Sequence, residues 1–462
     1  AVLLEPLDLE AHINLGLFHQ AMDAPSAALS VFDAALQIFP DSAELHLNLA
    51  IPLQRLSAHR EAADHCRCAI ILNPQMAQAY TNLGLLQGSQ TPEALLHRAY
   101  QRAVRLQPTI LEPRNNLALC LIDSDRIGES ILLLQSVLVL DPSHADALNN
   151  LSIVWKKQGQ RSQARIALKR SLVLRPFFAE ALNNLGVLLY QDGEVSEALL
   201  CAQRALVLAP DHAQTWSNLS VMAPIPLKPF DAVQLAERGV LIDSQSSGGF
   251  NNLGVARHER GQYLSALEAY SRAISLEPQM ASAHCNRGQT LLLLGHLKEG
   301  WGDYEWRYRD PSTHLSPREP RPLRWDPADG FLSRTFLLHH EQGLGDTIQF
   351  CRYASRVADL GGTVFLEVQP ELKDLVATLD PRVRVMASGE KLPNYNVHYS
   401  ILSMAAHFEA LGEPPPSQTG YLRASPKRLE AWRQDLGPKF RLRVGLCFSG
   451  HPGHTRDGLR SI

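Results

Sequence analysis

The chain has 462 residues, which is enough for two or three domains. Its 44 basic and 47 acidic residues nearly balance, which argues against a protein whose main partner is a nucleic acid or an anionic membrane. No run of 18 apolar residues is present to span a bilayer. The seven cysteines are scattered without a CxxC pair, so we expect no zinc site and no disulfide framework, but free thiols in a reducing cytoplasm.

One polar residue recurs through the first two thirds of the chain. Asparagine returns at a constant interval without a gap, at Asn14, Asn48, Asn82, Asn116, Asn150, Asn184, Asn218, Asn252 and Asn286. A leucine follows it in eight of nine cases, and the residue after that is always glycine, alanine or serine. A proline shares the period, with Ser244 in the one missing slot. The interval, about 34 residues, predicts a helix-turn-helix repeat.

Each repeat is expected to form two antiparallel helices. The leucine and the small residue face the partner helix, where a small side chain lets the two axes approach closely. The proline follows the second helix, which it cannot continue. This pattern resembles the tetratricopeptide family over residues 1–310, as about nine repeats. The resemblance implies a right-handed superhelix, a solenoid whose concave groove is lined by the first helices and binds a protein or an extended peptide.

The asparagine column is the first candidate for function, because the rest of the pattern has a packing explanation. It precedes the packing leucine by one residue, which places it about 100° around the helix, toward the groove. An amide offers donors and an acceptor that match a peptide bond, so the nine asparagines are predicted to bind a peptide backbone. The NNLG sequences resemble the asparagine ladder of eukaryotic O-GlcNAc transferases. The alternative is that each asparagine bonds to the backbone of a neighbouring repeat and only fixes the stacking.

Histidines and aromatic residues are the other conspicuous side chains of the repeats. His12, His46 and His284 share one repeat position, but unrelated residues occupy it elsewhere, so packing rather than metal binding is expected there. The second helix of the ninth repeat holds Trp301, Tyr304, Trp306 and Tyr308. Aromatic residues at this density predict a capping surface that packs on the region that follows.

A change of period marks a second architecture. Residues 311–334 contain five prolines and no helical or strand pattern, which predicts a linker. Short apolar runs at 336–339, 364–368 and 383–386 then alternate with helical segments at 347–360, 370–379 and 402–411, and a fourth strand is possible at 395–399. This order predicts a βαβ unit with a parallel sheet. Ligands of such sheets bind at the carboxyl ends of the strands, where the Gly-Leu-Gly-Asp turn ending at Asp346 lies.

Several motifs beyond the repeats carry a second resemblance. They are WGDYEWR at 301–307, EQGLGDTIQF at 341–350 and RVGLCFSGHPGHTRDGLRS at 443–461. Together they resemble bacterial tetratricopeptide proteins fused to a glycosyltransferase similar to the heptosyltransferases. The resemblance implies a Rossmann-like N-terminal half of a GT-B glycosyltransferase at residues 335–440, which binds the acceptor. Residues 441–462 are then the start of the second, donor-binding half, and the chain is expected to be truncated at both ends.

The resemblance also implies site residues. Gly345 and Asp346 match the family's catalytic Gly-Asp, so Asp346 is expected to be the base that deprotonates the acceptor hydroxyl in an inverting transfer. The alternative role for Asp346 is an N-cap of a helix that begins at Thr347. Acceptor binding is expected from Glu341, Gln342, Gly343 and Gly345. No metal and no cofactor are expected, since the leaving diphosphate of a nucleotide-sugar co-substrate is held by helix N-termini and basic side chains.

The donor site is expected in the last residues of the chain. Its nucleotide-sugar-binding candidates are Gly450, His454, Arg460 and Ser461. The rest of a donor domain is absent from the sequence, so this chain alone is expected to be inactive.

The leading hypothesis is a cytoplasmic glycosyltransferase fragment whose groove recruits an acceptor protein, with no nucleic acid as partner. The alternative is a non-catalytic tetratricopeptide scaffold for protein–protein interaction. A third option is a two-lobed polysaccharide-synthesis enzyme that its repeats dock to an assembly. UDP-linked N-acetylglucosamine and ADP-linked heptose remain equally open as donors.

Overall fold

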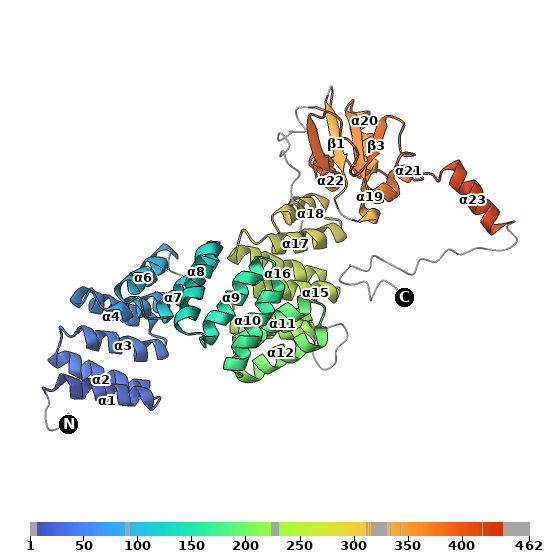
Figure 1. The fold of residues 1–462 in the computed structure, drawn as a ribbon. Helices are drawn as coiled ribbons and strands as arrows, with labels where there is room; N and C mark the ends of the chain where they lie inside the picture. Colours follow the sequence, from blue (N-terminus) through green and yellow to red (C-terminus); the bar gives the residue numbers. More distant parts are fainter. Residues whose placement is uncertain are drawn as a thin grey trace. The chain divides into compact units, whose positions relative to one another are not determined.

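The computed structural model describes residues 7–87, 93–222, 231–310, 313, 315, 330–332, 334–341, 343–417 and 419–437. The chain divides into two compact units, Ala1–Gln245 and Ser246–Ile462, and each is taken by itself (Figure 1). The residues at 1–6, most of the expected linker and 438–462, including the expected donor segment, lie outside the described residues.

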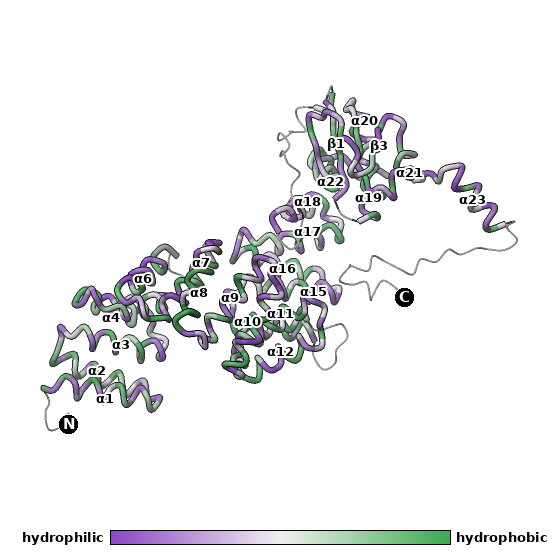
Figure 2. Tube along the Cα trace, viewed as in Figure 1, coloured by the Kyte–Doolittle hydropathy of each residue, from purple (hydrophilic) through white to green (hydrophobic). Residues whose placement is uncertain are grey.

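The first unit is built of antiparallel helix pairs, as the repeat period predicts. Within its described residues the pairs are α1 (Leu9–Ala21) and α2 (Pro25–Ile38), α3 (Ala43–Arg55) and α4 (His59–Leu72), α5 (Ala77–Gln87) and α6 (Glu93–Leu106), α7 (Glu112–Asp123) and α8 (Ile127–Leu140), α9 (Ala145–Lys157) and α10 (Arg161–Leu174), α11 (Ala179–Gln191) and α12 (Val195–Leu208), and α13 (Ala213–Met222) and α14 (Ala232–Ile242). Hydrophilic and hydrophobic residues alternate along these helices, as helices that bury one face require (Figure 2).

Local signals set the helix ends. Ser42 begins α3 with its hydroxyl accepting a hydrogen bond from the Leu45 N–H, at 3.3 Å, which satisfies one of the free donors of the first turn. The described turns inside the pairs contain a left-handed residue. Gly159 and Gly193 fill this position with φ of 74° and 84°, and Asp125 fills it in an earlier repeat with φ of 56°.

The small residue two places after each column asparagine does pack against the partner helix. A Cβ built on Gly16 would lie 2.2 Å from the Phe32 ring, and one built on Gly84 would lie 2.6 Å from the Tyr100 ring. The two glycines share one repeat position and the two rings share another. In each of these pairs the aromatic ring of the second helix packs against the glycine of the first helix. The packing explanation of this column is thereby confirmed.

The second unit joins further helix pairs to a sheet. The pairs are α15 (Ser247–Glu259) and α16 (Tyr263–Leu276), then α17 (Ala281–Leu293) and α18 (Leu297–Tyr304), with the 3-10 helix η2 (Glu305–Tyr308). The strands are β1 (Thr335–His339), β2 (Thr363–Val368), β3 (Val383–Ala387) and β4 (Val397–Ser400). All pairings are parallel, and the strand order is β3-β2-β1-β4. The three predicted strands and the possible fourth are thus present.

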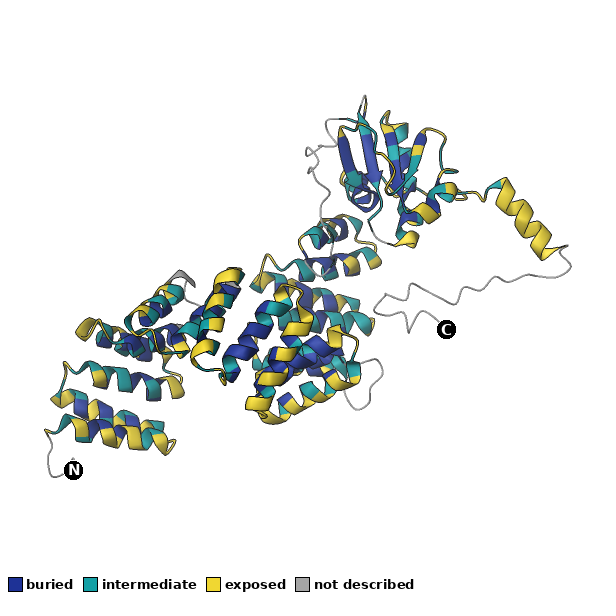
Figure 3. Cartoon of the chain, in the orientation of Figure 1, coloured by how far each residue is buried: buried dark blue, intermediate teal, exposed yellow. Residues whose placement is uncertain are grey.

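The helices of this unit differ from the prediction in detail. The segment expected as one helix at 347–360 is two, α19 (Leu344–Phe350) and α20 (Arg352–Asp359). They separate at the buried Cys351, because the Ala354 N–H bonds to a carbonyl only three residues back. The segment expected at 370–379 is the short pair η5 (Pro370–Leu372) and α21 (Lys373–Val376), while α22 (Ile401–Ala410) agrees with the prediction. The remaining helix, α23 (Pro426–Leu436), buries none of its residues (Figure 3).

The predicted capping surface is part of the sheet's core. Trp301 of α18 belongs to the same buried cluster as β1, β2 and α22, and its ring meets Phe350 edge-on at 5.7 Å. The prediction that the aromatic residues pack on the following region is therefore confirmed for Trp301 and Tyr304, whereas Trp306 stacks on His284 of α17. None of the described helices is both long and apolar enough to cross a membrane.

Candidate functional sites

The asparagine column forms a ladder of side-chain hydrogen bonds between repeats. The Asn150 Nδ2 donates to the Asn115 Oδ1 at 2.9 Å, and Asn184 and Asn218 donate in the same way to Asn149 and Asn183, each at 2.9 Å. In the second unit Asn286 donates to Asn251 at 3.0 Å. The acceptor is always the first asparagine of an Asn-Asn pair, one repeat earlier. These bonds tie neighbouring repeats together through side chains.

The ladder divides the column into two groups. The acceptor position is Ile13 and Leu47 in the first two repeats and Thr81 in the third, so no amide is available there. Accordingly, the side-chain amides of Asn48 and Asn116 make no hydrogen bond to a described residue, and the Asn82 amide accepts only from Gln78 of its own helix, at 3.0 Å. We call the first group, Asn14, Asn48, Asn82 and Asn116, the unladdered asparagines. The second group, Asn150, Asn184, Asn218 and Asn286, is the laddered asparagines. Asn252, whose acceptor position is Ser217, belongs to neither group.

The two groups of asparagines therefore have different surroundings. The laddered asparagines fix repeat stacking, and Asn150 is only 5% exposed. The partners are side chains, whereas backbone partners were expected. Asn14 is exposed, and Asn48, Asn82 and Asn116 are half-buried, so these four amides keep hydrogen-bonding groups within reach of a ligand. First helices of adjacent repeats also contact each other more than second helices do, so the column lies on the inner side of the stack.

The histidine column serves packing and local hydrogen bonds. His284 stacks on Trp306 with ring centroids 3.9 Å apart, and its Nδ1 lies 2.9 Å from Asp303. His46 lies 2.9 Å from His65, Nδ1 to Nδ1. Burial and the neighbouring His46 lower the pKa of His65. Across the part of the chain that the structure describes, no group of three ligating side chains is arranged for a metal ion.

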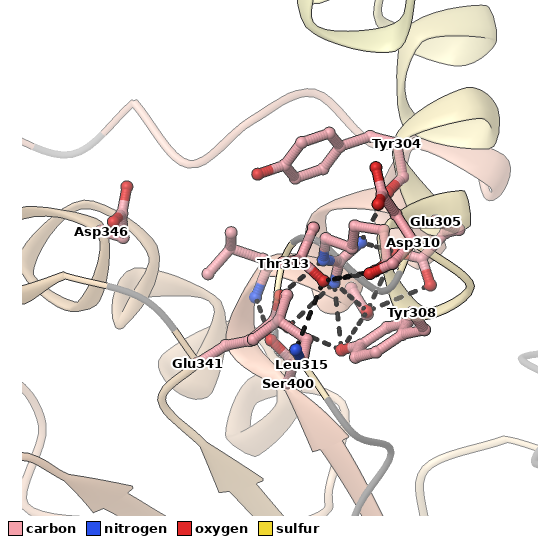
Figure 4. A network of polar contacts seen from close by, with 12 residues as sticks. Tyr304, Glu305, Tyr308, Asp310, Thr313, Leu315, Glu341, Asp346 and Ser400 are labelled. Carbon is pink, nitrogen blue, oxygen red and sulfur yellow. Dashed lines mark hydrogen bonds and ion pairs between the residues drawn. The ribbon is translucent and has the colours of Figure 1, made fainter. Parts of the chain in front are cut away.

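The second candidate region lies at the carboxyl ends of β1 and β4, where a buried arginine dominates (Figure 4). Arg307 of η2 has a side chain only 1% exposed. Its guanidinium donates to both carboxylate oxygens of Glu341, at 2.5 and 3.0 Å, and to Glu305 at 2.6 Å. It also donates to the Ser403 hydroxyl at 2.8 Å. This cluster joins the last helices of the array to the sheet.

The electrostatics of Glu341 follow from that cluster. Its side chain is 4% exposed, and burial alone would raise the pKa of Glu341. The hydrogen bonds and charge of Arg307 outweigh burial and hold the pKa below its ordinary value. Tyr308 donates a further hydrogen bond to the same carboxylate, at 2.6 Å. An acceptor contact by Glu341 stays a prediction, and any such ligand would compete with Arg307.

Asp346 lies apart from the Glu341 cluster (Figure 4). It is the third residue of α19, which begins at Leu344 and not at Thr347, and Gly343 holds the N-cap position. One carboxylate oxygen of Asp346 accepts the Gly343 N–H at 2.9 Å, and the other makes no hydrogen bond to a described residue. The side chain is half-buried. The carboxylate therefore closes the turn after β1 and still presents one oxygen.

The remaining predicted residues are distributed as follows. Gly343 and Gly345 are exposed beside Asp346. Gln342 and the donor candidates Gly450, His454, Arg460 and Ser461 lie outside the described residues.

Two features escaped the sequence interpretation. The Asn-Asn pairs contained the signal for the ladder, because the laddered asparagines are those preceded by such a pair one repeat earlier. The aromatic residues around Arg307 predicted a packing surface, but no local pattern indicated that Arg307 would pair with the distant Glu341.

Comparisons with known proteins match the repeats. Models of the tetratricopeptide repeat match residues 144–175 and 179–212, and a TPR repeat model matches residues 250–295. Protein FlbA of Caulobacter vibrioides is 27% identical over 220 residues, which make up 42% of this chain and 36% of FlbA. The matched part thus spans about a third of that relative.

Three solved structures are similar to parts of the chain. The APC/C hetero-tetramer Cut9–Hcn1 has a TM-score of 0.49 at 16% identity, over 61% of this chain and 55% of that one. YrrB, described as a TPR protein with an unusual peptide-binding site, has a TM-score of 0.31 at 19% identity, over 40% of this chain and 95% of YrrB. For pilF of Pseudomonas aeruginosa the TM-score is 0.35 at 19% identity, over 43% of this chain and 90% of pilF.

Proposed function

Because the chain carries tetratricopeptide repeats, we propose that it is a protein–protein interaction scaffold whose first unit holds an extended segment of a partner protein. The observation that carries this proposal is the division of the asparagine column. The laddered asparagines stiffen one part of the stack, whereas the unladdered asparagines present amides that no neighbouring described repeat uses. An amide pairs with a peptide bond through one donor and one acceptor, so a row of them favours a backbone over particular side chains.

The experiment compares matched triple variants of the full chain. Asn48, Asn82 and Asn116 changed to alanine should weaken binding of a peptide selected from a random phage-displayed library by at least tenfold, because three amide contacts are lost. Far-UV circular dichroism and the melting temperature should not change, since no inter-repeat bond is removed. The control triple, Asn150, Asn184 and Asn218 changed to alanine, should lower the melting temperature. Equal peptide affinity for the first triple and the parent chain would refute the groove role.

We also propose, as a second function, that residues 335–440 are the acceptor-binding half of a glycosyltransferase. The support is the strand order β3-β2-β1-β4, all parallel, together with a carboxylate in the turn after the central β1. A doubly wound sheet with this order binds its ligand outside the carboxyl ends of its strands. The carboxylate oxygen of Asp346 that does not accept the Gly343 N–H lies at that edge. There it would deprotonate the hydroxyl group of a bound acceptor.

The two carboxylates that follow β1 have different roles under this second function. Both oxygens of Glu341 are committed to Arg307 and Tyr308, so Glu341 holds the fold together there. Asp346 has the spare oxygen and is our candidate base. The donor would be a nucleotide-sugar bound by residues that follow 440, and the protein would act in the cytoplasm.

A test of this function uses the full-length gene product. An Asp346→Asn variant should lose sugar transfer from a radiolabelled nucleotide-sugar to an acceptor, with the fold retained, because asparagine can still accept the Gly343 N–H but cannot take a proton. An unchanged rate would remove Asp346 as the base. No transfer by the parent protein with any nucleotide-sugar would leave the scaffold function as the only one.

A further inference from the structure

An unusual set of exposed apolar side chains lies on the second helices of three consecutive repeats. The six residues are Leu132 and Val139 on α8, Ile166 and Val173 on α10, and Leu200 and Val207 on α12, with exposed fractions of 67%, 80%, 66%, 79%, 60% and 83%. We call these six residues the outer apolar patch. Figure 3 shows the exposed outer side of α12.

The patch has a strict register. Its residues occupy the same two positions of three consecutive repeats, and within each helix the two positions are seven apart. Seven residues make two helical turns, so both positions face the same way and lie about 10.5 Å apart along the axis. The patch is therefore two parallel rows of three side chains across α8, α10 and α12, on the helices that do not carry the asparagine column. On α14 one row continues with Leu241, while the other position is Gln234.

The preceding repeats show that these positions do not require apolar residues. The same two positions hold Arg98 and Arg105 on α6, and Asp64 and Ile71 on α4, and the two arginines and the aspartate are exposed. The outward surface thus changes from charged to apolar between α6 and α8. Scattered exposed apolar residues need no explanation, but a set ordered in this way marks an interaction surface.

The size of the patch fits an ordinary protein interface. Complete burial of one Val, Leu or Ile side chain removes roughly 60–120 Å² of apolar surface from water, so six supply on the order of 400–700 Å². A standard interface buries about 800 Å² per partner, of which a little over half, or about 450 Å², is apolar. The outer apolar patch alone meets that apolar requirement, and the polar side chains between its rows, such as Gln135 and Gln203, would supply the remainder.

We propose that the outer apolar patch is a self-association surface, so that two copies of the chain pair through α8, α10 and α12. A twofold axis places the same patch on both sides, which requires a surface that is complementary to itself. Apolar rows meet this requirement without matching charges. Between the rows, the exposed charged side chains are Lys169, Arg170 and Arg204, whose long stems let their charged groups reach solvent at the edge of the contact.

Sedimentation velocity of the full 462-residue chain tests the proposal. The parent chain should be a dimer at about 100 µM, because interfaces of roughly 1,600 Å² have micromolar or lower dissociation constants. The double variant Val173→Glu/Val207→Glu should raise the dissociation constant at least about a hundredfold, since it forces unpaired carboxylates into an apolar contact. Its circular dichroism should not change, because both side chains are about four-fifths exposed in one copy.

Ile71→Glu is the matched control. Ile71 occupies the Val173 position on α4, is 77% exposed, and lies outside the patch, so this variant should dimerise like the parent chain. A parent chain that stays monomeric at about 100 µM would overturn the proposal, whatever other protein the patch binds. A dimer that survives the double variant, or that Ile71→Glu disrupts equally, would overturn it too. Should the double variant fail to fold, Val173→Ser/Val207→Ser replaces it and must also weaken the dimer.

Discussion

Removal of the Arg307 guanidinium gives the sharpest test of how the array and the sheet of the second unit are held together. In Arg307→Met the side chain keeps much of its length and loses its charge. Glu341 is then left with a side chain 4% exposed and with the uncharged donors Tyr308 and Ser400. Breaking a buried ion pair by removal of one partner costs about 3–5 kcal/mol, because the remaining charge is buried and uncompensated. We therefore expect the second unit to lose about 3 kcal/mol or more of stability.

Amide hydrogen exchange, measured by mass spectrometry on the full chain, shows which helices and strands lose stability. A loss of about 3 kcal/mol should speed the exchange of the β1 and α22 amides by roughly a hundredfold, while α1–α12 should exchange as in the parent chain. Arg382→Met is the control within the same unit, because Arg382 pairs with Asp380 and Asp359 at the surface, and this variant should not alter the exchange of β1.

The double variant Arg307→Met/Glu341→Leu should recover most of the loss. It leaves no carboxylate at position 341, and apolar replacements of a buried ion pair are often neutral or stabilising. Exchange of β1 that stays at the parent rate in Arg307→Met would refute the reasoning. A double variant no more stable than the single one would show instead that the packing of Arg307 matters more than its charge.

The other predictions concern single positions. Gly254→Ala should destabilise the second unit by about 1–3 kcal/mol, because its Cβ would lie 2.4 Å from the Tyr270 ring, whereas Gly302→Ala in open helix should be neutral or stabilising; thermal unfolding compares them. The pKa of His65 is lower in the folded chain than in the unfolded chain, so the unfolded chain takes up a proton there at a higher pH. The first unit should therefore lose stability as pH falls below about 6.5. In His65→Gln this pH dependence of stability should shrink. An unchanged dependence would show that His65, beside His46, is not its source. Glu341, whose pKa is also lowered, contributes stability above about pH 4.3 that is lost as pH falls further, which acid titration of Arg307→Met should no longer show.

Those elements of the fold that rest on local signals could be predicted from the sequence. The period of the asparagine column predicted the helix pairs, since each repeat carries its own packing residues and its own turn. Apolar runs predicted the strands to within a residue or two. The break at Cys351 was missed because the amphipathic pattern continues through it. The place of β4 beside β1 was missed because pairing between strands that are far apart in the chain leaves no local pattern.

The candidate site at the sheet was predictable only in part, for a related reason. The turn after β1 was recognised, yet two carboxylates follow that strand and both were expected to serve the same acceptor. Their different surroundings come from η2 and α22: η2 brings Arg307 to Glu341, α22 holds Arg307 through Ser403, and Asp346 lies outside this cluster. The contact between Arg307 and Ser403 joins residues 96 positions apart, and no motif near either residue predicts it.

The asparagine column shows how a repeat can encode two roles at one position. Where the preceding repeat supplies a second asparagine beside its own, the column asparagine finds an amide acceptor one repeat earlier. Where that neighbour is Ile13, Leu47 or Thr81, the same amide has no such acceptor. One residue type therefore links the repeats in the middle of the first unit and, under the proposed scaffold function, would bind a peptide at its beginning. The neighbour, and not the constant spacing of the column itself, decides which role each asparagine takes.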